Sequence, residues 1–513
     1  MPWPVARHMV QKELVHEICI HRVVDGDEQY LIRWRHDDPS QAVLSWHRLE
    51  DLISIADVLQ LYITEYIARL KRDHPEALKA PSLRTSSLKR KSPHDEGASR
   101  RASSLDTTTT PDFHRATQKL EVYNGVLFRK SGDIYPHYLT SAKVERIDAT
   151  TVPTPAMLAA AKAEVYEGVK KGRKFVRAVF LQQLAGIPGP PVTFVNEVNK
   201  ETPSLSFTYI QDYVYGEGVS READAVEMGC SKCRPDMGSN RGCEYTKRCE
   251  CLEYATPDFR GQGLSDEEQR AQYEAWEAGD LDPKGLSKRF PYRIDHDPRI
   301  NIKQYVLDSF YLESRNVLYE CNSRCRCGPN CKNRLVQRGR KIPLEVFRTS
   351  KRGFGLRCPE NLRRGQYIDR YIGELITDAE ADARESSSGP EKASYLFWLD
   401  KFANDDGLPG SLKTSDCYVA DGQKMGGPTR FINHSCNPNC RLFTVSYNKY
   451  NRTIYDLAFF ALTDIPAGTE LTFDYMDLEE GEAGQATKEV VDEDSVVVDC
   501  LCGAKNCRKK LWM

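Results

Sequence analysis

The sequence predicts a multidomain protein whose domains are stabilised by zinc. Its 513 residues suffice for roughly two to four domains. Of its 17 cysteines, nine lie between Cys230 and Cys331, and three more are Cys500, Cys502 and Cys507. Such clustering in a reducing compartment indicates metal binding, because structural disulfides are rare there.

Charge and hydropathy narrow the class of protein. The net charge of -2 argues against general electrostatic binding to nucleic acid, although local basic patches remain possible. The longest apolar runs, among them Leu457 to Leu462, have the length of a strand and fall short of the roughly 18 residues of a membrane span. The N-terminal stretch carries charge where a secretory signal needs an apolar region. We therefore expect a nuclear or cytosolic protein without a membrane partner.

The first predicted unit is a small α+β module over residues 10–70. Val15 to Val24 and Tyr30 to Trp34 are typical of strands, with Gly26 in the turn between them. Ile55 to Leu70 has helical apolar spacing and is expected to pack over the sheet. The segments EICIHR, QYLIRWR and SWHRLEDL give this module a resemblance to a chromodomain.

A chromodomain binds methyl-lysine in a cage of three aromatic side chains, whose π faces attract the ammonium group. Trp34 matches one cage position, whereas Leu14 and Asp37 occupy the other two. The alternatives are a weak reader of methyl-lysine and a structural or protein-binding module.

The sequence predicts less about the two segments that follow this module. Residues 71–118 are rich in Ser, Thr, Pro and charge, which predicts a disordered basic linker. It is either a solvated spacer or a nuclear localisation or nucleic-acid contact. Residues 119–190 are expected to form a helical connecting region, with a long helix from Met157 to Leu184. No chemical role is assigned to that region.

The larger cysteine cluster has spacings that suit a shared metal centre. Nine thiolates are not a multiple of four, so separate four-cysteine sites do not account for them. Six terminal and three bridging thiolates would satisfy three tetrahedral zinc ions. The proposed ligands are Cys230, Cys233, Cys243, Cys249, Cys251, Cys321, Cys325, Cys327 and Cys331.

From Pro191 to the C-terminus the chain resembles the SET-domain histone H3 lysine-9 methyltransferases of the suppressor-of-variegation family, in its fungal heterochromatin form. The resemblance rests on five motifs in the order of the family, together with the flanking cysteines. These are KRGFGL (351–356), YIGELIT (371–377), SYLFWLD (394–400), GPTRFINHSC (427–436) and ELTFDY (470–475). It implies a pre-SET domain at 191–340, a SET domain at 341–477, an acidic insert at 478–495 and a post-SET motif at 496–513.

The fold implied by the resemblance is mainly β, with short strands and a knot-like active site. The post-SET arrangement implies that Cys436 is the fourth ligand of a tail zinc held by Cys500, Cys502 and Cys507. That zinc would fasten the tail beside the active site.

The resemblance also implies a site for S-adenosyl-L-methionine. Gly353 and Gly355 would allow close backbone approach to the cofactor, and Phe354 occupies a position that is usually Trp. The implied cofactor-binding residues are Arg352, Gly353, Phe354, Gly355, Tyr395, Arg430, Asn433 and His434.

The reaction needs a neutral lysine amine, although free lysine has a pKa of about 10.4. A dry aromatic channel disfavours the charged amine. Tyr475 matches the catalytic tyrosine of the family, and Tyr395, Phe473 and Trp512 are expected to complete the channel walls. Phe473 has no hydroxyl to hold a water beside the amine, which predicts methylation up to the trimethyl state.

The predicted function is therefore methylation of lysine 9 of histone H3 during heterochromatin formation. The predicted partners are the histone H3 tail, the nucleosome and heterochromatin adaptor proteins, in the nucleus. The alternatives are a methyltransferase for another lysine and a non-catalytic zinc-stabilised scaffold. The acidic insert contains Lys488, a hypothetical automethylation site.

Overall fold

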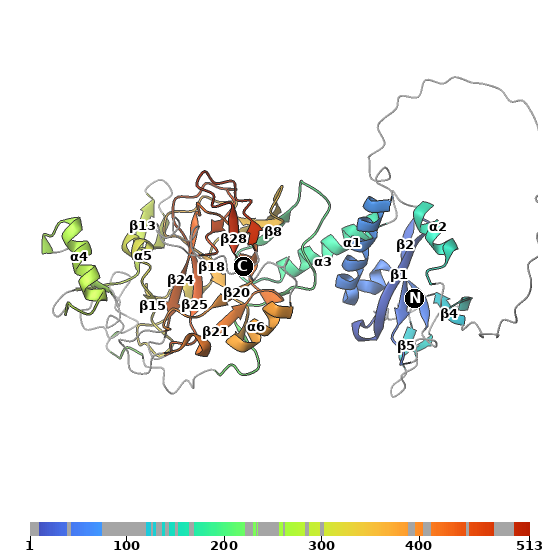
Figure 1. Cartoon of the computed structure of the whole chain (residues 1–513), viewed down its shortest axis with the longest axis horizontal. Helices are drawn as coiled ribbons and strands as arrows, with labels where there is room; N and C mark the ends of the chain where they lie inside the picture. The colour runs from blue at the N-terminus through green and yellow to red at the C-terminus, as the bar shows by residue number, and fades with distance from the viewer. Residues whose placement is uncertain are drawn as a thin grey trace, which may run out of the picture. The chain divides into compact units, whose positions relative to one another are not determined.

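The computed structural model divides the chain into two units, residues 1–179 and 180–513, and each is treated by itself. Figure 1 shows the elements of both units along the chain. The structure describes residues 10–37, 43–73, 119–124, 127–129, 136–138, 143–148, 152–163, 169–220, 229–231, 233, 256–259, 262–282, 287–297, 302–387, 395–403, 412–447, 451–476 and 497–512. None of the described helices is long and apolar enough to cross a membrane.

A five-stranded sheet organises the first unit. Its strand order is β1 (Val15–Val24), β2 (Asp27–Trp34), β3 (Leu44–Arg48), β4 (Lys119–Asn124) and β7 (Lys143–Asp148). The β1–β2 turn contains Asp25 and Gly26, both with positive φ, at 52° and 77°. Helix α1 (Ala56–Asp73) buries Leu59, Tyr62 and Ile63, as its apolar spacing predicts.

The prediction of a helical region over residues 119–190 is wrong in its first half. Strands β4 and β7 extend the sheet, and β5 (Leu127–Arg129) pairs with β6 (Pro136–Tyr138). The alternation of buried Leu120 and Val122 with half-buried Glu121 has the period of a strand, which places one apolar face on the core. In place of one helix from 157 to 184 there are two, α2 (Pro155–Ala163) and α3 (Lys170–Ala185).

Trp34 lies in the interior of this unit. Its side chain is 6% exposed, and its indole Nε1 donates a hydrogen bond to Ser45 Oγ at 2.7 Å. Ser45 Oγ in turn lies 2.6 Å from His47 Nε2. Because this ring is buried and hydrogen-bonded, it does not present an open face to a ligand. The chromodomain-like character of residues 10–70 stays a prediction.

The second unit is mainly β, as predicted. A three-stranded sheet has the order β17 (Phe354–Arg357), β16 (Leu344–Arg348) and β8 (Val192–Val195). A four-stranded sheet has the order β10 (Val214–Tyr215), β19 (Glu374–Thr377), β21 (Tyr418–Asp421) and β20 (Leu396–Trp398). A second four-stranded sheet has the order β15 (Leu318–Tyr319), β24 (Cys440–Ser446), β25 (Asp456–Ala461) and β18 (Tyr367–Tyr371). Strands β18, β24 and β25 lie side by side in Figure 1.

Several strand pairs and short helices complete this unit. The pairs are β9 (Thr208–Tyr209) with β22 (Met425–Gly426), β11 (Thr256–Asp258) with β12 (Ser287–Arg289), β13 (Tyr292–Asp297) with β14 (Ile302–Leu307), β23 (Asn433–His434) with β26 (Thr472–Phe473), and β27 (Val497–Asp499) with β28 (Lys510–Trp512). The helices are α4 (Asp266–Glu277), α5 (Ser309–Ser314) and α6 (Asp378–Ser387).

Strand β25 forms the centre of the core. All six of its residues are buried, and Phe459 and Phe460 are fully buried. A strand covered on both faces carries a continuous apolar run in place of alternation. This explains the uninterrupted apolar run from Leu457 to Leu462.

The segment predicted to be pre-SET is built into the sheets of the predicted SET domain. Strands β8, β9, β10 and β15 each add in parallel to a strand that follows residue 341. The backbone of Glu320 adds to this connection, because its N–H donates a hydrogen bond to Ser446 O at 3.0 Å. Within the predicted pre-SET segment, the buried Glu320 carboxylate accepts hydrogen bonds from the Tyr292 hydroxyl and from the backbone N–H groups of Leu335 and Val336, each at 2.7 Å. The two predicted domains therefore share their sheets.

Two sequence predictions lie outside the described residues. These are the basic linker beyond residue 73 and the acidic insert with Lys488. Both stay predictions.

Candidate active site and metal centres

The site forms where strands β23 and β26 pair in parallel. Asn433 lies opposite Thr472, and His434 lies opposite Phe473. Asn439 secures the same junction, since its side chain donates to Glu470 O and accepts from Thr472 N, both at 2.8 Å. The pairing brings the NHSC and ELTFDY motifs together although they are far apart in the sequence.

A cavity of about 1240 Å³ opens at this junction. It exceeds the roughly 300–1,000 Å³ of an ordinary ligand pocket, so there is room for a cofactor and a substrate side chain together. Nine of the residues predicted to bind the cofactor or to form the lysine channel line it, namely Arg352, Gly353, Phe354, Tyr395, Arg430, Asn433, His434, Phe473 and Tyr475.

The two glycines of the KRGFGL motif are required for different reasons. Gly353 has a φ of 69°, a left-handed conformation that favours glycine. Gly355 does not line the cavity. A Cβ atom on Gly355 would lie 2.8 Å from Glu470 Oε1 and 3.0 Å from the Phe347 ring. The close approach that the structure shows at Gly355 is therefore to protein atoms, and its contact with the cofactor stays a prediction.

Glu470 holds together three of the residues predicted to bind the cofactor. Its Oε1 accepts a hydrogen bond from Asn433 Nδ2 at 2.8 Å, and its Oε2 pairs with the Arg352 guanidinium. Arg352 also donates to His434 O at 3.0 Å, and Asn433 Nδ2 is 3.2 Å from Phe354 O. Glu470 belongs to the ELTFDY motif, but the sequence alone gives it no role, because its partners are more than 30 residues away along the chain.

Arg430 lies in an aromatic stack. Its guanidinium carbon is 4.1 Å from the ring centroid of Phe207, 4.7 Å from that of Tyr395 and 5.2 Å from that of Phe431. Its buried Nε has no hydrogen-bond partner within the described part of the chain. Arginine favours such stacking because its planar cation is weakly hydrated. Phe207 is a second residue to which the sequence alone assigns no role.

The backbone of Tyr395 is held at two points. Its carbonyl oxygen accepts hydrogen bonds from the Tyr371 hydroxyl at 2.6 Å and from Gly422 N at 3.0 Å. Tyr371 also lines the cavity. The YIGELIT motif contained this tyrosine, but only the fold shows which atom its hydroxyl reaches.

Phe473 and Tyr475 form part of an aromatic wall. The Phe473 ring centroid lies 4.7 Å from that of Tyr475 and 5.0 Å from that of Phe459. The Tyr475 hydroxyl donates to Ile432 O at 3.0 Å. Tyr475 is 38% exposed, and it lines the cavity, while the protein atoms around it raise the pKa of its hydroxyl well above the usual value. The phenol is therefore neutral at physiological pH.

His434 supports Tyr475 as a neutral imidazole. Burial lowers the pKa of His434 to about 4, against the opposing effect of Asp474. Its Nδ1 accepts the backbone N–H of Tyr475 at 3.2 Å, which requires an unprotonated nitrogen. The 3.5 Å separation between this nitrogen and Asp474 Oδ1 is therefore not an ion pair.

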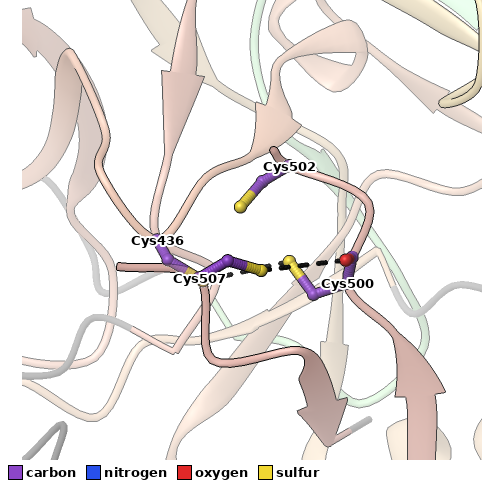
Figure 2. Close-up of side chains that lie close together, drawn as sticks. All are labelled: Cys436, Cys500, Cys502 and Cys507. Atoms are coloured by element: carbon purple, nitrogen blue, oxygen red, sulfur yellow. Dashed lines mark hydrogen bonds between the residues drawn. The ribbon is translucent and has the colours of Figure 1, made fainter. Parts of the chain in front are cut away.

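The four cysteines predicted to hold a tail zinc converge, as Figure 2 shows. The Sγ atoms of Cys436, Cys500, Cys502 and Cys507 all lie within 4.8 Å of one another. Cys436 and Cys500 are 3.9 Å apart, close to the roughly 3.8 Å expected between sulfurs of a tetrahedral zinc with bonds of about 2.3 Å. The donor set fits zinc.

Six of the nine cysteines predicted to form the larger cluster are described, and they are buried together. These are Cys230, Cys233, Cys321, Cys325, Cys327 and Cys331. The Sγ atoms of Cys321, Cys327 and Cys331 lie within 4.8 Å of one another. Cys243, Cys249 and Cys251 lie outside the described residues, so the number of zinc ions stays a prediction. Every described cysteine is free of disulfides.

Trp512 belongs to the tail hairpin. Its backbone lies in β28 opposite Val497 of β27, and its side chain is outside the described part of the structure. Its place in the lysine channel stays a prediction.

Two family profiles match the chain. The profile described as SET domain matches residues 353–476, and the one described as Pre-SET motif matches residues 185–334. The fold, the cavity and the two profiles thus define a SET-domain protein with a pre-SET segment, whose cysteine clusters are compatible with zinc.

The chain is 42% identical over 325 residues to the histone-lysine N-methyltransferase, H3 lysine-9 specific, KMT1 of Fusarium mangiferae, covering 63% of this chain and 88% of that one. It is 39% identical over 324 residues to the corresponding enzyme dim-5 of Neurospora crassa, with the same coverage. The solved structure of Neurospora DIM-5 superposes with a TM-score of 0.45 at 36% identity, covering 56% of this chain and 96% of that one. This chain belongs to the SET-domain histone-lysine N-methyltransferases, which confirms the resemblance stated above.

Proposed function

We propose that this enzyme transfers methyl groups from S-adenosyl-L-methionine to lysine 9 of histone H3, up to the trimethyl state, in nuclear heterochromatin. One observation supports this above all others: the predicted cofactor residues and the predicted channel residues line a single cavity. The choice of lysine 9 rests on the names of the relatives, which are H3 lysine-9 specific.

The cofactor would lie on the side of the cavity formed by Arg352, Gly353, Phe354, Arg430 and Asn433. When bound, it supplies a methyl group on a sulfonium, which a neutral amine can attack. Glu470 neutralises Arg352 and fixes the Asn433 amide. Arg430, with its unpartnered Nε, offers a hydrogen-bond donor that a polar ligand can use.

The substrate lysine would enter on the aromatic side of the cavity. Phe397, Phe473 and Tyr475 offer apolar surface there, which disfavours the ammonium form of the lysine. Because the neutral Tyr475 hydroxyl already donates to Ile432 O, it can accept a hydrogen bond from the amine and so orient it. Because methyl transfer joins two bound groups, most of the rate acceleration comes from alignment.

Strand β20 suits an extended peptide. Among the described strands it is the last of its sheet, and its residues Leu396 to Trp398 line the cavity. A strand at the edge of a sheet can accept a peptide as a further strand through backbone hydrogen bonds. Asp400 and Glu385 also line the cavity and would favour a basic peptide such as the H3 tail.

The test is a radiolabelled methyl-transfer assay on H3 tail peptides. We expect transfer to the wild-type peptide, none to a peptide with arginine in place of lysine 9, and severe loss with Tyr475→Phe enzyme. Equal labelling of both peptides would redirect the proposal to another lysine. No labelling of any H3 peptide or nucleosome by zinc-loaded protein would favour the scaffold alternative.

A further inference from the structure

An arginine of the tail forms a two-point ion pair with the residue before Tyr475. Arg508 Nη1 donates to Asp474 Oδ2 at 2.8 Å, and Arg508 Nη2 donates to Asp474 Oδ1 at 2.6 Å. The side chains are only 7% and 15% exposed, respectively. A bidentate, largely buried pair of this kind fixes orientation as well as distance.

Each partner of this pair is next in sequence to a residue of a predicted site. Arg508 directly follows Cys507, a ligand of the predicted tail zinc, and Asp474 directly precedes Tyr475. The tail is also joined to the NHSC motif, because Arg508 N donates to Cys436 Sγ at 3.4 Å and Asn506 Nδ2 to Cys436 O at 3.0 Å. The Arg508–Asp474 pair adds a contact from the tail to the ELTFDY segment.

Asp474 also accepts a hydrogen bond from the residue that follows Tyr475. Its Oδ1 accepts the backbone N–H of Met476 at 3.1 Å. The Tyr475 backbone N–H is held by His434, so the short segment from 474 to 476 is fixed by three contacts. Arg508, Asp474 and Tyr475 all line the cavity.

We propose that the Asp474–Arg508 pair is a clasp through which the zinc-bound tail positions Tyr475 for methyl transfer. Arg508 is then a positioning residue, which acts on the reaction through Asp474. This inference rests on the proposed function, in which Tyr475 orients the lysine amine. Misplacement of a catalytic group by about 1 Å can cost on the order of a hundredfold in rate, so a modest loosening of the clasp has a large effect.

The experiment compares full-length Arg508→Met, Arg508→Lys, Asp474→Asn and the Arg508→Met/Asp474→Asn double variant. Zinc content, kcat and the KM for H3 peptide are measured for each. Lysine keeps the charge but loses the planar fork, so Arg508→Lys tests geometry at constant charge. The matched control is Lys510→Met, which removes the exposed tail ion pair with Asp499.

We expect Arg508→Met and Asp474→Asn to retain wild-type zinc and to lose about tenfold or more in kcat, as removal of a charge-assisted hydrogen bond implies. Arg508→Lys should fall between wild type and Arg508→Met. The double variant should be no slower than the slower single variant, because both act through one contact. Lys510→Met should match the wild type.

Three results would overturn the clasp. They are an unchanged kcat in Arg508→Lys and Arg508→Met, losses that multiply in the double variant, and loss of zinc that parallels the loss of activity in every variant, Arg508→Lys included. Inactive wild-type enzyme would instead contradict the proposed function, so the two failures are distinguishable.

Discussion

The carboxylate of Glu470 connects Asn433 to Arg352, accepting from the Asn433 amide at 2.8 Å through one oxygen and pairing with Arg352 through the other. The side chains of Arg352 and Glu470 are 21% and 19% exposed, and Arg352 and Asn433 line the cavity. The three side chains come from three separate motifs. They meet because β17 and the segment before β26 lie together, with Leu471 N donating to Leu356 O at 2.8 Å.

The first prediction follows from this contact. Glu470→Ala leaves the Arg352 guanidinium and the Asn433 amide without their shared partner, which weakens the cofactor site. We expect cofactor affinity to fall about tenfold, in line with the loss of a hydrogen bond to a charged group. Calorimetric titration with S-adenosylhomocysteine measures this. Glu470→Gln, which can still accept from Asn433, should lose less, and equal losses in both variants would contradict the role of the Asn433 contact.

The second prediction concerns the product. Phe473 is 5% exposed and lies among aromatic rings, so it offers no hydrogen bond to a water beside the amine. Phe473→Tyr should stall at mono- or dimethyl-lysine, whereas the wild type proceeds to trimethyl-lysine. Mass spectrometry of the peptide at matched numbers of turnovers distinguishes the two. Monomethyl product alone from the wild type is the result that would refute this prediction.

The third prediction concerns the tail zinc. Cys507→Ser removes one of four converging thiolates. We expect loss of about one zinc ion in about four, because a tetrahedral site with three thiolates binds zinc weakly. Activity should be abolished, since the tail lines the cavity. Metal analysis by mass spectrometry checks the count, and full activity of this variant would show that the tail zinc is dispensable. Cys417→Ser, at a cysteine outside both clusters, is the matched control.

The fourth prediction concerns pH. The protein atoms around the Tyr475 hydroxyl raise its pKa above the ordinary value, which is about 10, so we expect the phenol to stay protonated as pH rises from 7 to 10. Over the same range the substrate amine loses its proton, and the rate should increase with pH. Tyr475→Phe should lower the rate at every pH and leave the shape of the profile unchanged. A profile that flattens in this variant would mean that ionisation of Tyr475 sets the pH dependence.

The fifth prediction concerns the N-terminal module. Trp34, the one aromatic residue at a predicted cage position, is buried and bonded to Ser45. Binding of residues 1–513 to a trimethylated H3 peptide through this module should therefore be weaker than roughly 1 µM, about -8 kcal/mol. Calorimetry with Tyr475→Phe protein, compared with the same protein carrying Trp34→Phe, measures it. Tight binding that disappears with Trp34→Phe would prove the assignment of Leu14 and Asp37 to the cage wrong.

Much of the site was predictable from local sequence. The cysteine spacings pointed to Cys500, Cys502 and Cys507, and the family resemblance implied Cys436 as their partner. The same resemblance, carried by the NHSC and ELTFDY motifs, implied Asn433, His434, Phe473 and Tyr475, and these four residues line one cavity. Such residues are recognisable because each lies within a short motif. Strands β1 and β2 and helix α1 were also predictable, since their apolar periodicity is local.

Other features depended on partners far away in the chain. The roles of Glu470, Tyr371 and Phe207 follow from contacts with Asn433, the Tyr395 carbonyl and Arg430, respectively. The alternation in β4 was visible in the sequence, but its place beside β3 depends on parallel pairing across about 75 residues. The sequence by itself determined which chemical groups this enzyme possesses. Only the tertiary structure decided which of them touch, because hydrogen bonds and packing depend on distances that no local pattern of residues encodes.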